Sequence, residues 1–316
     1  MKTLLRLFIV LFATAAAAQS YPSKPIRILV AFPPGGPVDI VARLIAPKLG
    51  ESLGQSVVVE NKVGASGNIA TVEVAKSAPD GYTLLTHSSA YAVNPALYKN
   101  AGYDPVKDLA PVAIVASQAN IILVNSSFPA NTLEDLRKQM LSGKLAFGSP
   151  GSGTTPHLTA VNLFHVHWKA DATHIPFKGA GPLVPALLTG EPPIGCLAGS
   201  GPMSNIKAGK LRALAVSSAK RLPQLPDVPT LKELDYPGME DYTWVGVFAP
   251  AGTPREIAQK LNEAILKAVQ AQDMRDRLDG LAFEPTAAPL KETADYVRAE
   301  VEKWGRVVRE TKATAD

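Results

Sequence analysis

Short runs of β-branched and apolar residues alternate along this chain with segments of helical periodicity, and glycine-rich turns join the two. In the first third, we expect strands at 26–32, 57–59 and 82–86 and helices at 38–49 and 68–76. Helices that connect successive strands cover the faces of a sheet whose strands run parallel. The alternation therefore predicts an α/β fold with a parallel sheet.

The same alternation continues to the C-terminus. We expect strands at 112–115, 121–124, 145–148, 172–175, 211–216 and 244–249 and helices at 132–140, 157–166, 180–188, 255–269 and 291–308. A chain of 316 residues has room for two domains of roughly 150 residues each. Residues 116–120 and 241–244 are candidates for crossing between two lobes, as in a hinged protein. If both cross, lobe I comprises residues 19–119 plus 245–316, and lobe II comprises residues 120–244.

The N-terminus has the layout of a secretory signal peptide. Lys2 and Arg6 are basic, the run up to Phe12 is otherwise apolar, and small residues follow it. This layout predicts a signal peptide at 1–18, cleaved before Gln19, and a mature protein in the periplasm. An N-terminal anchor helix is the alternative, although the apolar run is shorter than the roughly 20 residues that span a bilayer.

The cysteine content bears on how the chain is stabilised, and the net charge bears on what it binds. Cys196 is the only cysteine, so the exported chain has to rely on its own core rather than on an internal disulfide. The net charge is +4, but Lys2 and Arg6 leave with the signal peptide, and 30 basic residues then remain against 28 acidic ones. A nearly neutral mature chain gives no reason to expect a nucleic-acid partner.

The signatures of common enzymes are missing from the sequence. The Gly-x-Ser-x-Gly motif of serine hydrolases is absent around Ser152, because Pro150 stands where the first glycine is needed. The sequence also has no P-loop and no dinucleotide-binding glycine motif. His165-Val166-His167 lies near His174, but without further ligands these histidines are expected to be solvated rather than to hold a metal. We therefore expect no catalytic residue, metal or cofactor. An exported serine hydrolase that uses Ser149 or Ser152 stays as an alternative.

Two glycine-rich turns, at 34–37 and 149–155, each join a strand to a helix. The first N–H groups of a helix lack intrahelical partners and carry a partial positive charge, so such turns suit an anion. The second turn adds the hydroxyl donors of Ser149, Thr154 and Thr155. Each turn alone is explained by ordinary capping. Together, one in each lobe, they predict a cleft that closes on a carboxylate, with the strand end Ser88-Ser89 on the same rim.

A series of motifs runs in order through the mature chain. They are Phe32-Pro33-Pro34-Gly35-Gly36-Pro37-Val38-Asp39, Pro79-Asp80-Gly81-Tyr82-Thr83-Leu84-Leu85, Phe177-Lys178-Gly179, Asp227-Val228-Pro229-Thr230 and Ala249-Pro250-Ala251-Gly252-Thr253-Pro254. In these motifs the chain resembles the Bug family, the substrate-binding receptors of tripartite tricarboxylate transporters. The resemblance implies a two-lobe periplasmic binding protein of type II, a Venus flytrap, with two hinge crossovers.

The resemblance also implies a function. A receptor of this kind has no catalytic activity; it captures a small carboxylate between its lobes and delivers the ligand to a membrane permease. We expect it to be a monomer. A ligand-sensing partner of a membrane kinase is an alternative that the sequence leaves open.

The family's binding positions carry over onto this chain residue by residue. One ligand carboxylate is held between the two turns, and the matching positions are Gly35, Gly36, Pro37 and Val38 in lobe I and Ser149, Gly153, Thr154 and Thr155 in lobe II. Ser88 and Ser89 are expected to add contacts from lobe I. His157 matches a histidine of the family. Two roles stay open for it: contact with the ligand, or capping and packing of the helix.

One stretch departs from the family pattern. Gly190-Glu191-Pro192-Pro193-Ile194-Gly195-Cys196 stands where the family usually has Gly-x-Val-Asp, and the next five residues are small and expected to be flexible. In the family, this region helps to read the far end of the ligand. Gly199 and Ser200 are therefore expected contacts, and Lys178 is the candidate for a second carboxylate. The departure predicts an unusual or larger ligand.

Overall fold

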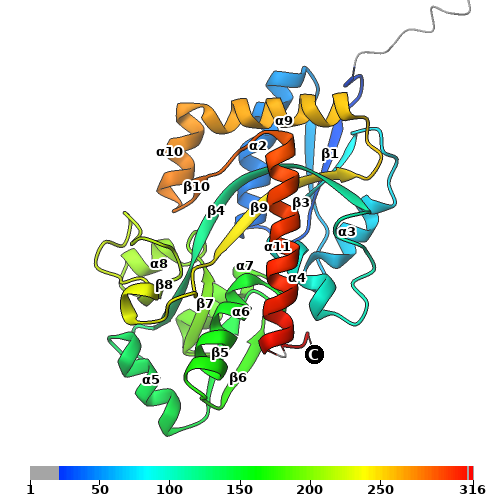
Figure 1. Cartoon of the computed structure of the whole chain (residues 1–316). Helices are drawn as coiled ribbons and strands as arrows, with labels where there is room; N and C mark the ends of the chain where they lie inside the picture. Colours follow the sequence, from blue (N-terminus) through cyan, green and yellow to red (C-terminus); the bar gives the residue numbers. More distant parts are fainter. Residues whose placement is uncertain (1–20, 312, 316) are drawn as a thin grey trace, which may run out of the picture.

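The computed structural model of the chain describes residues 21–311 and 313–315, and the predicted signal peptide lies outside them. The molecule has a mixed α/β fold with two lobes (Figure 1). In Figure 1 one half lies above and the other below, and two long strands run between them. The predicted two-lobe α/β class is confirmed.

The elements follow the predicted alternation closely. The strands are β1 (Ile26–Val30), β2 (Val57–Asn61), β3 (Thr83–Ser88), β4 (Leu109–Asn125), β5 (Leu145–Ser149), β6 (Ala172–Pro176), β7 (Ile194–Ala198), β8 (Leu211–Val216), β9 (Tyr242–Pro250) and β10 (Glu284–Pro285). The α-helices are α2 (Pro37–Leu53), α3 (Asn68–Ala75), α4 (Ala90–Leu97), α5 (Leu133–Ser142), α6 (Thr155–Val161), α7 (Ala180–Thr189), α8 (Met203–Lys207), α9 (Arg255–Gln270), α10 (Gln272–Gly280) and α11 (Leu290–Thr311). Two short 3₁₀ turns, η1 (Ala65–Gly67) and η3 (Lys232–Leu234), and a π-helical turn, η2 (Asn162–His167), complete the described fold.

The sheet is mixed rather than parallel. Its strand order is β2-β1-β3-β9-β4-β7-β5-β6, with β8 and β10 paired to β4 outside this order. β1 pairs in parallel with β2 and β3, and β5 pairs in parallel with β6 and β7. The expectation of a purely parallel sheet was wrong because β9 enters between β3 and β4 from the other half and is antiparallel to both.

β4 is one strand of 17 residues where two strands were expected. The polar residues that suggested a break find partners without leaving the sheet: Gln118 Oε1 accepts from the Ser200 N–H, and Asn120 Nδ2 donates to Asp241. The strand therefore continues without a break: β4 pairs with β9 from Leu109 to Ala119 and with β7 from Asn120 onward. Both segments predicted as crossovers lie at or beside these two strands, which link the halves. The lobe boundaries themselves stay a prediction.

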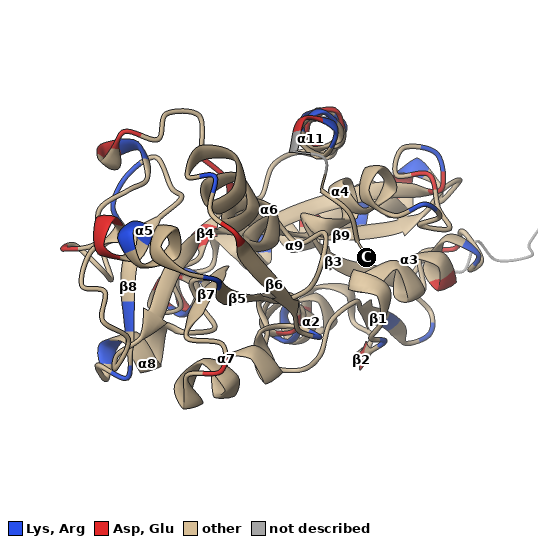
Figure 2. Cartoon of the chain, turned by 90° about the horizontal axis from the view of Figure 1, so that it is seen from below, with Lys and Arg blue, Asp and Glu red and all other residues tan. Residues whose placement is uncertain are grey.

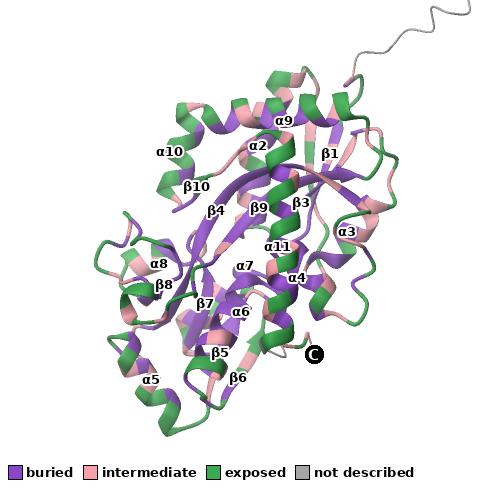
Figure 3. Ribbon diagram, in the orientation of Figure 1, coloured by how far each residue is buried: buried purple, intermediate pink, exposed green. Residues whose placement is uncertain are grey.

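Each half has apolar cores of its own. One core gathers β1, β3, β9 and the inner faces of α2, α4, α9 and α11, and two smaller cores lie on either side of the β4–β7–β5 region. Figure 3 shows the long strands buried and the outer helix faces exposed. Figure 2 shows the charged residues mainly on outer helices and loops. Among the described residues, no helix has the length and apolar character needed to cross a membrane.

Two further expectations were corrected. The helix expected at 157–166 begins at Thr155, with Thr154 as its N-cap, and becomes π-helical from Asn162 onward. The stretch expected to be flexible, 197–201, begins inside β7: Leu197 and Ala198 are the last two residues of that strand, all of which is buried. β7 is inserted between β4 and β5, and its apolar side chains fit that buried position.

Candidate functional site

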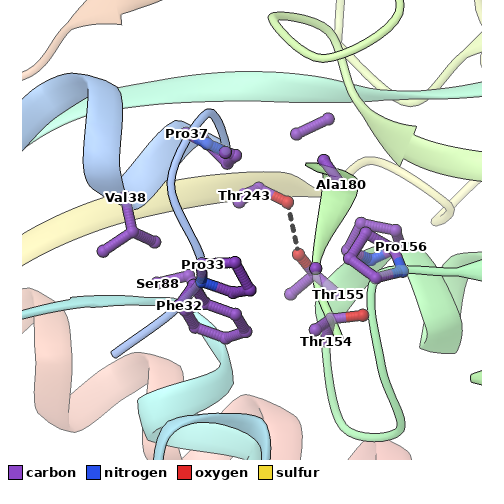
Figure 4. Close-up of a pocket in the computed structure, with 14 residues that line it drawn as sticks. Phe32, Pro33, Pro37, Val38, Ser88, Thr154, Thr155, Pro156, Ala180 and Thr243 are labelled. Atoms are coloured by element: carbon purple, nitrogen blue, oxygen red, sulfur yellow. Dashed lines mark hydrogen bonds between the residues drawn. The ribbon is translucent and has the colours of Figure 1, made fainter. Parts of the chain in front are cut away.

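A narrow cleft lies between the two halves, where β1 and β5 both end. It encloses about 440 Å³ including its open mouth. It is lined by Phe32, Pro33, Gly36, Pro37, Val38, Ser88, Pro150, Thr154, Thr155, Pro156, Gly179, Ala180, Ala198 and Thr243. In Figure 4, Phe32, Pro33 and Ser88 face Thr154, Thr155 and Pro156 across the cleft, and Thr243 lies between the two sides. No lining side chain is charged.

The turn that follows β1 forms the first wall. Gly36 is the N-cap of α2 and Pro37 occupies the first turn, where its missing N–H costs nothing. Asp39, which is almost fully buried, accepts from the Gly35 N–H at 3.0 Å and from Arg43 Nε at 2.9 Å. Burial tends to raise the pKa of Asp39, but these bonds and one from Asn61 outweigh it and hold that pKa below its ordinary value. The charged Asp39 thus fixes the shape of the turn.

The loop from Ser149 to Thr155 forms the second wall. Thr154 accepts from the His157 N–H and donates to Gly151 O at 2.8 Å, which caps α6 and closes the loop. His157 Nδ1 lies 3.3 Å from the Gly153 N–H and accepts from it. Burial is the main reason that the pKa of His157 falls to about 3, so this ring is neutral and can accept that bond.

A chain of polar side chains connects the cleft with the strands that link the halves. Ser89 Oγ lies 3.0 Å from Thr155 Oγ1, which lies 2.8 Å from Thr243 Oγ1. The last of these bonds is the dashed line in Figure 4. Thr243 donates in turn to Asn120 Oδ1 at 2.7 Å, and Asn120 Nδ2 reaches Asp241 at 2.6 Å. The cleft is therefore coupled through hydrogen bonds to both β4 and β9.

The two halves are closed on each other. Ser66 Oγ of the first half donates to Ser152 O of the second, at 2.5 Å, and Tyr98 Oη also reaches that carbonyl. Gly153 packs so closely under Asn94 that a Cβ at this glycine would lie 2.5 Å from the Asn94 amide oxygen. These contacts define a closed cleft.

The predicted site residues fall into three groups, of which the first two lie at the cleft. Those that line the cleft are Gly36, Pro37, Val38, Ser88, Thr154 and Thr155. Those that lie behind it are Gly35, Ser89, Ser149, Gly153 and His157, which shape the turns or support the lining residues. Whether any of them contacts a ligand stays a prediction.

Lys178, Gly199 and Ser200 lie outside the cleft. Lys178 is exposed and lines an adjoining cavity of about 640 Å³, open mouth included, that shares Phe32 and Pro150 with the cleft. Gly199 and Ser200 donate backbone N–H bonds to Ala119 O and Gln118 Oε1 on β4. These two positions therefore support the linking strand directly.

Of the three histidines expected to be solvated, His167 is exposed, whereas His165 and His174 are half-buried. His87 and His157 are buried. His157 stacks on His174 with ring centroids 4.1 Å apart, and His174 Nε2 lies 2.7 Å from Ser149 Oγ. Burial lowers the pKa of His174 to about 4. In the described residues, no three histidine, cysteine or acidic side chains gather as metal ligands would.

Sequence reasoning missed several residues of the cleft. Thr243 stands within a predicted crossover, next to Trp244, and no local motif marks it. Ala180 begins α7 and Ala198 ends β7, and only the folded chain brings these two residues to the cleft. Phe32, Pro33 and Gly179 belong to motifs that were identified in the sequence, and Pro150 lies in the second glycine-rich turn, so the sequence did mark these four positions.

Comparisons with known proteins agree with this architecture. The profile of the tripartite tricarboxylate transporter family receptors matches residues 41–312. The solved structure of periplasmic binding protein BugD is 32% identical, covers 93% of this chain and 99% of its own, and superposes with a TM-score of 0.89. R. palustris Rpa4515 with adipate is 33% identical, with coverages of 93% and 99% and a TM-score of 0.89. MatC from Rhodopseudomonas palustris with bound malate is 33% identical, with coverages of 91% and 100% and a TM-score of 0.86. This chain therefore belongs to the tripartite tricarboxylate transporter receptor family, as its resemblance to the Bug proteins predicted.

Proposed function

We propose that this chain is a periplasmic solute-binding receptor that captures a small carboxylate between its lobes and delivers it to a membrane permease. The observation that carries the proposal is the closed cleft between the N-terminus of α2 and the loop before α6. Helical N–H groups and the hydroxyl group of Ser88 replace water around an anion there without any charged side chain. The adipate of Rpa4515 and the malate of MatC are ligands of this class.

The proposal includes the finer assignments made from the sequence. The receptor is exported by the signal peptide at 1–18, acts as a monomer in the periplasm and needs no metal or cofactor. Its lobes comprise residues 19–119 plus 245–316 and residues 120–244, and closure of the lobes on the ligand shifts an equilibrium between open and closed forms. The site comprises the cleft residues and, behind them, the residues that shape the two turns.

The receptor is proposed to have no catalytic activity. Ser149 Oγ and His174 Nε2 are within hydrogen-bond distance, which is the pairing that a serine hydrolase needs. However, Ser149 is fully buried and does not line the cleft, and His174 stacks on another histidine rather than meeting a carboxylate. Ser149 instead exchanges bonds with the backbone of Gly151 and stabilises the loop. Ester turnover that is lost in Ser149→Ala would contradict this assignment.

Thermal unfolding in the presence of a panel of mono-, di- and tricarboxylates tests the proposal, after co-purified ligand has been removed and identified by native mass spectrometry. A ligand at a hundred times its Kd stabilises by about 2.7 kcal/mol, which raises Tm by several degrees. Thr154→Phe fills the cleft and should abolish the shift, whereas Thr154→Ser keeps the cap and should retain it. Absence of a shift with every acid would overturn the proposal. Genes for a permease pair or for a membrane kinase beside this one distinguish delivery from sensing.

A further inference from the structure

Not every hydroxyl group in the cleft has a hydrogen to offer a ligand. Four hydroxyl side chains line it, those of Ser88, Thr154, Thr155 and Thr243. Thr154 already donates its only hydrogen to Gly151 O. The direction of the bonds made by Thr155 and Thr243 follows from a carboxylate that lies behind the cleft, that of Asp241.

Asp241 lies just before β9 and is only 7% exposed. Its Oδ1 accepts from Asn120 Nδ2 at 2.6 Å, and its Oδ2 accepts from Thr159 Oγ1 on α6. An ionised carboxylate can only accept hydrogen bonds. The amide nitrogen of Asn120 therefore has to face Asp241, and the amide oxygen of Asn120 has to face the other way.

That orientation sets the direction of the whole chain. The Asn120 oxygen faces Thr243 Oγ1 at 2.7 Å, so Thr243 has to donate to it. Thr243 then has no hydrogen for Thr155, and Thr155 has to donate to Thr243 across the 2.8 Å between their hydroxyl oxygens. By the same logic, Ser89 donates to Thr155. The hydroxyl hydrogens of Ser89, Thr155 and Thr243 are therefore each donated to the next residue in the direction of Asn120. None of the three is left for a ligand in the cleft.

Thr155 and Thr243 consequently present only lone pairs to the cleft. The hydroxyl hydrogen of Ser88 is different, because it has no acceptor among the described residues. Lone pairs repel the oxygens of a carboxylate and attract the hydrogen of a hydroxyl group. An ammonium group would also donate, but it would be buried in a cleft that has no acidic lining residue.

On the basis of the proposed function, we infer that the preferred ligand is a hydroxy acid. Its carboxylate lies towards the N-terminus of α2 and Ser88, and its hydroxyl group donates to Thr155 or Thr243. Asp241 does not touch the ligand; it is a positioning residue, because it fixes the direction of the hydrogen bonds that make these two threonines acceptors.

The charge of Asp241 can be removed in two ways. Burial raises the pKa of Asp241 to about 6, against the opposing effects of hydrogen bonds from Thr159, Ser217 and Asn120 and of the charge on Lys303. The thiol of Cys196 also lies near it and stays neutral, because burial raises the pKa of Cys196 well above its ordinary value. Protonated Asp241, or an asparagine in its place, can donate to Asn120. The Asn120 amide can then turn, and Thr243 regains a hydrogen.

Isothermal titration calorimetry with matched acids tests this inference on the purified mature protein. The pairs are L-malate with succinate and citrate with tricarballylate, which differ by one hydroxyl group, and L-aspartate tests the ammonium alternative. At pH 7.5 we expect the hydroxy acid of at least one pair to bind about tenfold more tightly than its partner. In Asp241→Asn the preference should fall below about threefold, while Asp227→Asn, an exposed acid of the same half, should keep it.

A second measurement needs no variant. In the wild-type protein, the preference for the hydroxy acid should decrease between pH 7.5 and pH 5, and Asp241→Asn in the same buffers corrects for titration of the acids themselves. Equal affinities within both pairs would overturn the inference, as would aspartate binding as tightly as malate. A preference that neither Asp241→Asn nor low pH reduces would overturn the role of Asp241. Binding of no acid at all would overturn the proposed function as well.

Discussion

The buried carboxylate of Asp241 should make this protein lose folding stability as pH rises through the weakly acidic range. Burial raises its pKa to about 6 from an ordinary value of 3.8. Between these two values, the folded chain holds a proton that the unfolded chain has released, so folding is favoured at the acid end. A shift of about two pKa units corresponds to about 3 kcal/mol, which is lost as pH rises from about 4 to about 6 and stays lost above that.

Urea unfolding of the wild type and of Asp241→Asn at several pH values between 4 and 7.5 measures this contribution. The asparagine has the same shape and does not ionise. The difference between the two free energies of unfolding therefore isolates the contribution from ionisation of Asp241. Relative to the variant, the wild type should lose about 3 kcal/mol across this range. Asp227→Asn, in which an exposed carboxylate is removed, is the matched control for the substitution itself. Parallel stability curves for the wild type and Asp241→Asn, or a wild type that gains relative stability with rising pH, would refute the reasoning.

Three other predictions concern closure, the core and the thiol. Gly153→Ala adds a methyl group that clashes across the closed cleft, so it should weaken ligand binding at least tenfold, whereas Gly209→Ala has a similar positive φ but an open position and should bind normally; calorimetry compares the two. Glu300→Ala leaves two buried indole N–H groups without their acceptor and should cost about 3 kcal/mol in urea unfolding, with Glu300→Gln recovering part of the loss. Cys196 is fully buried with a raised pKa, so a thiol reagent should modify it only after denaturant is added; rapid reaction in native buffer would contradict its placement.

The sequence alone determined the fold class and most of the elements. Apolar runs of strand length between amphipathic helices have few packing solutions, and the glycine and proline turns mark where one element ends and the next begins. For the same reason, the turn at Gly35 and the loop at Thr154 can be identified from their residues as the walls of a cleft. The residues of these turns are contiguous in the chain, so local patterns suffice to find them.

Tertiary structure decided what the local patterns could not contain. The strand break expected near Asn120 does not occur, because the partners of its polar side chain come from residues more than a hundred positions away. Thr243 and Asp241 carry no motif, and they join the site only because β9 lies beside β4. Whether a threonine hydroxyl donates or accepts depends on every partner in its hydrogen-bond chain. That property belongs to the folded arrangement of Ser89, Thr155, Thr243 and Asn120, and no stretch of sequence carries it.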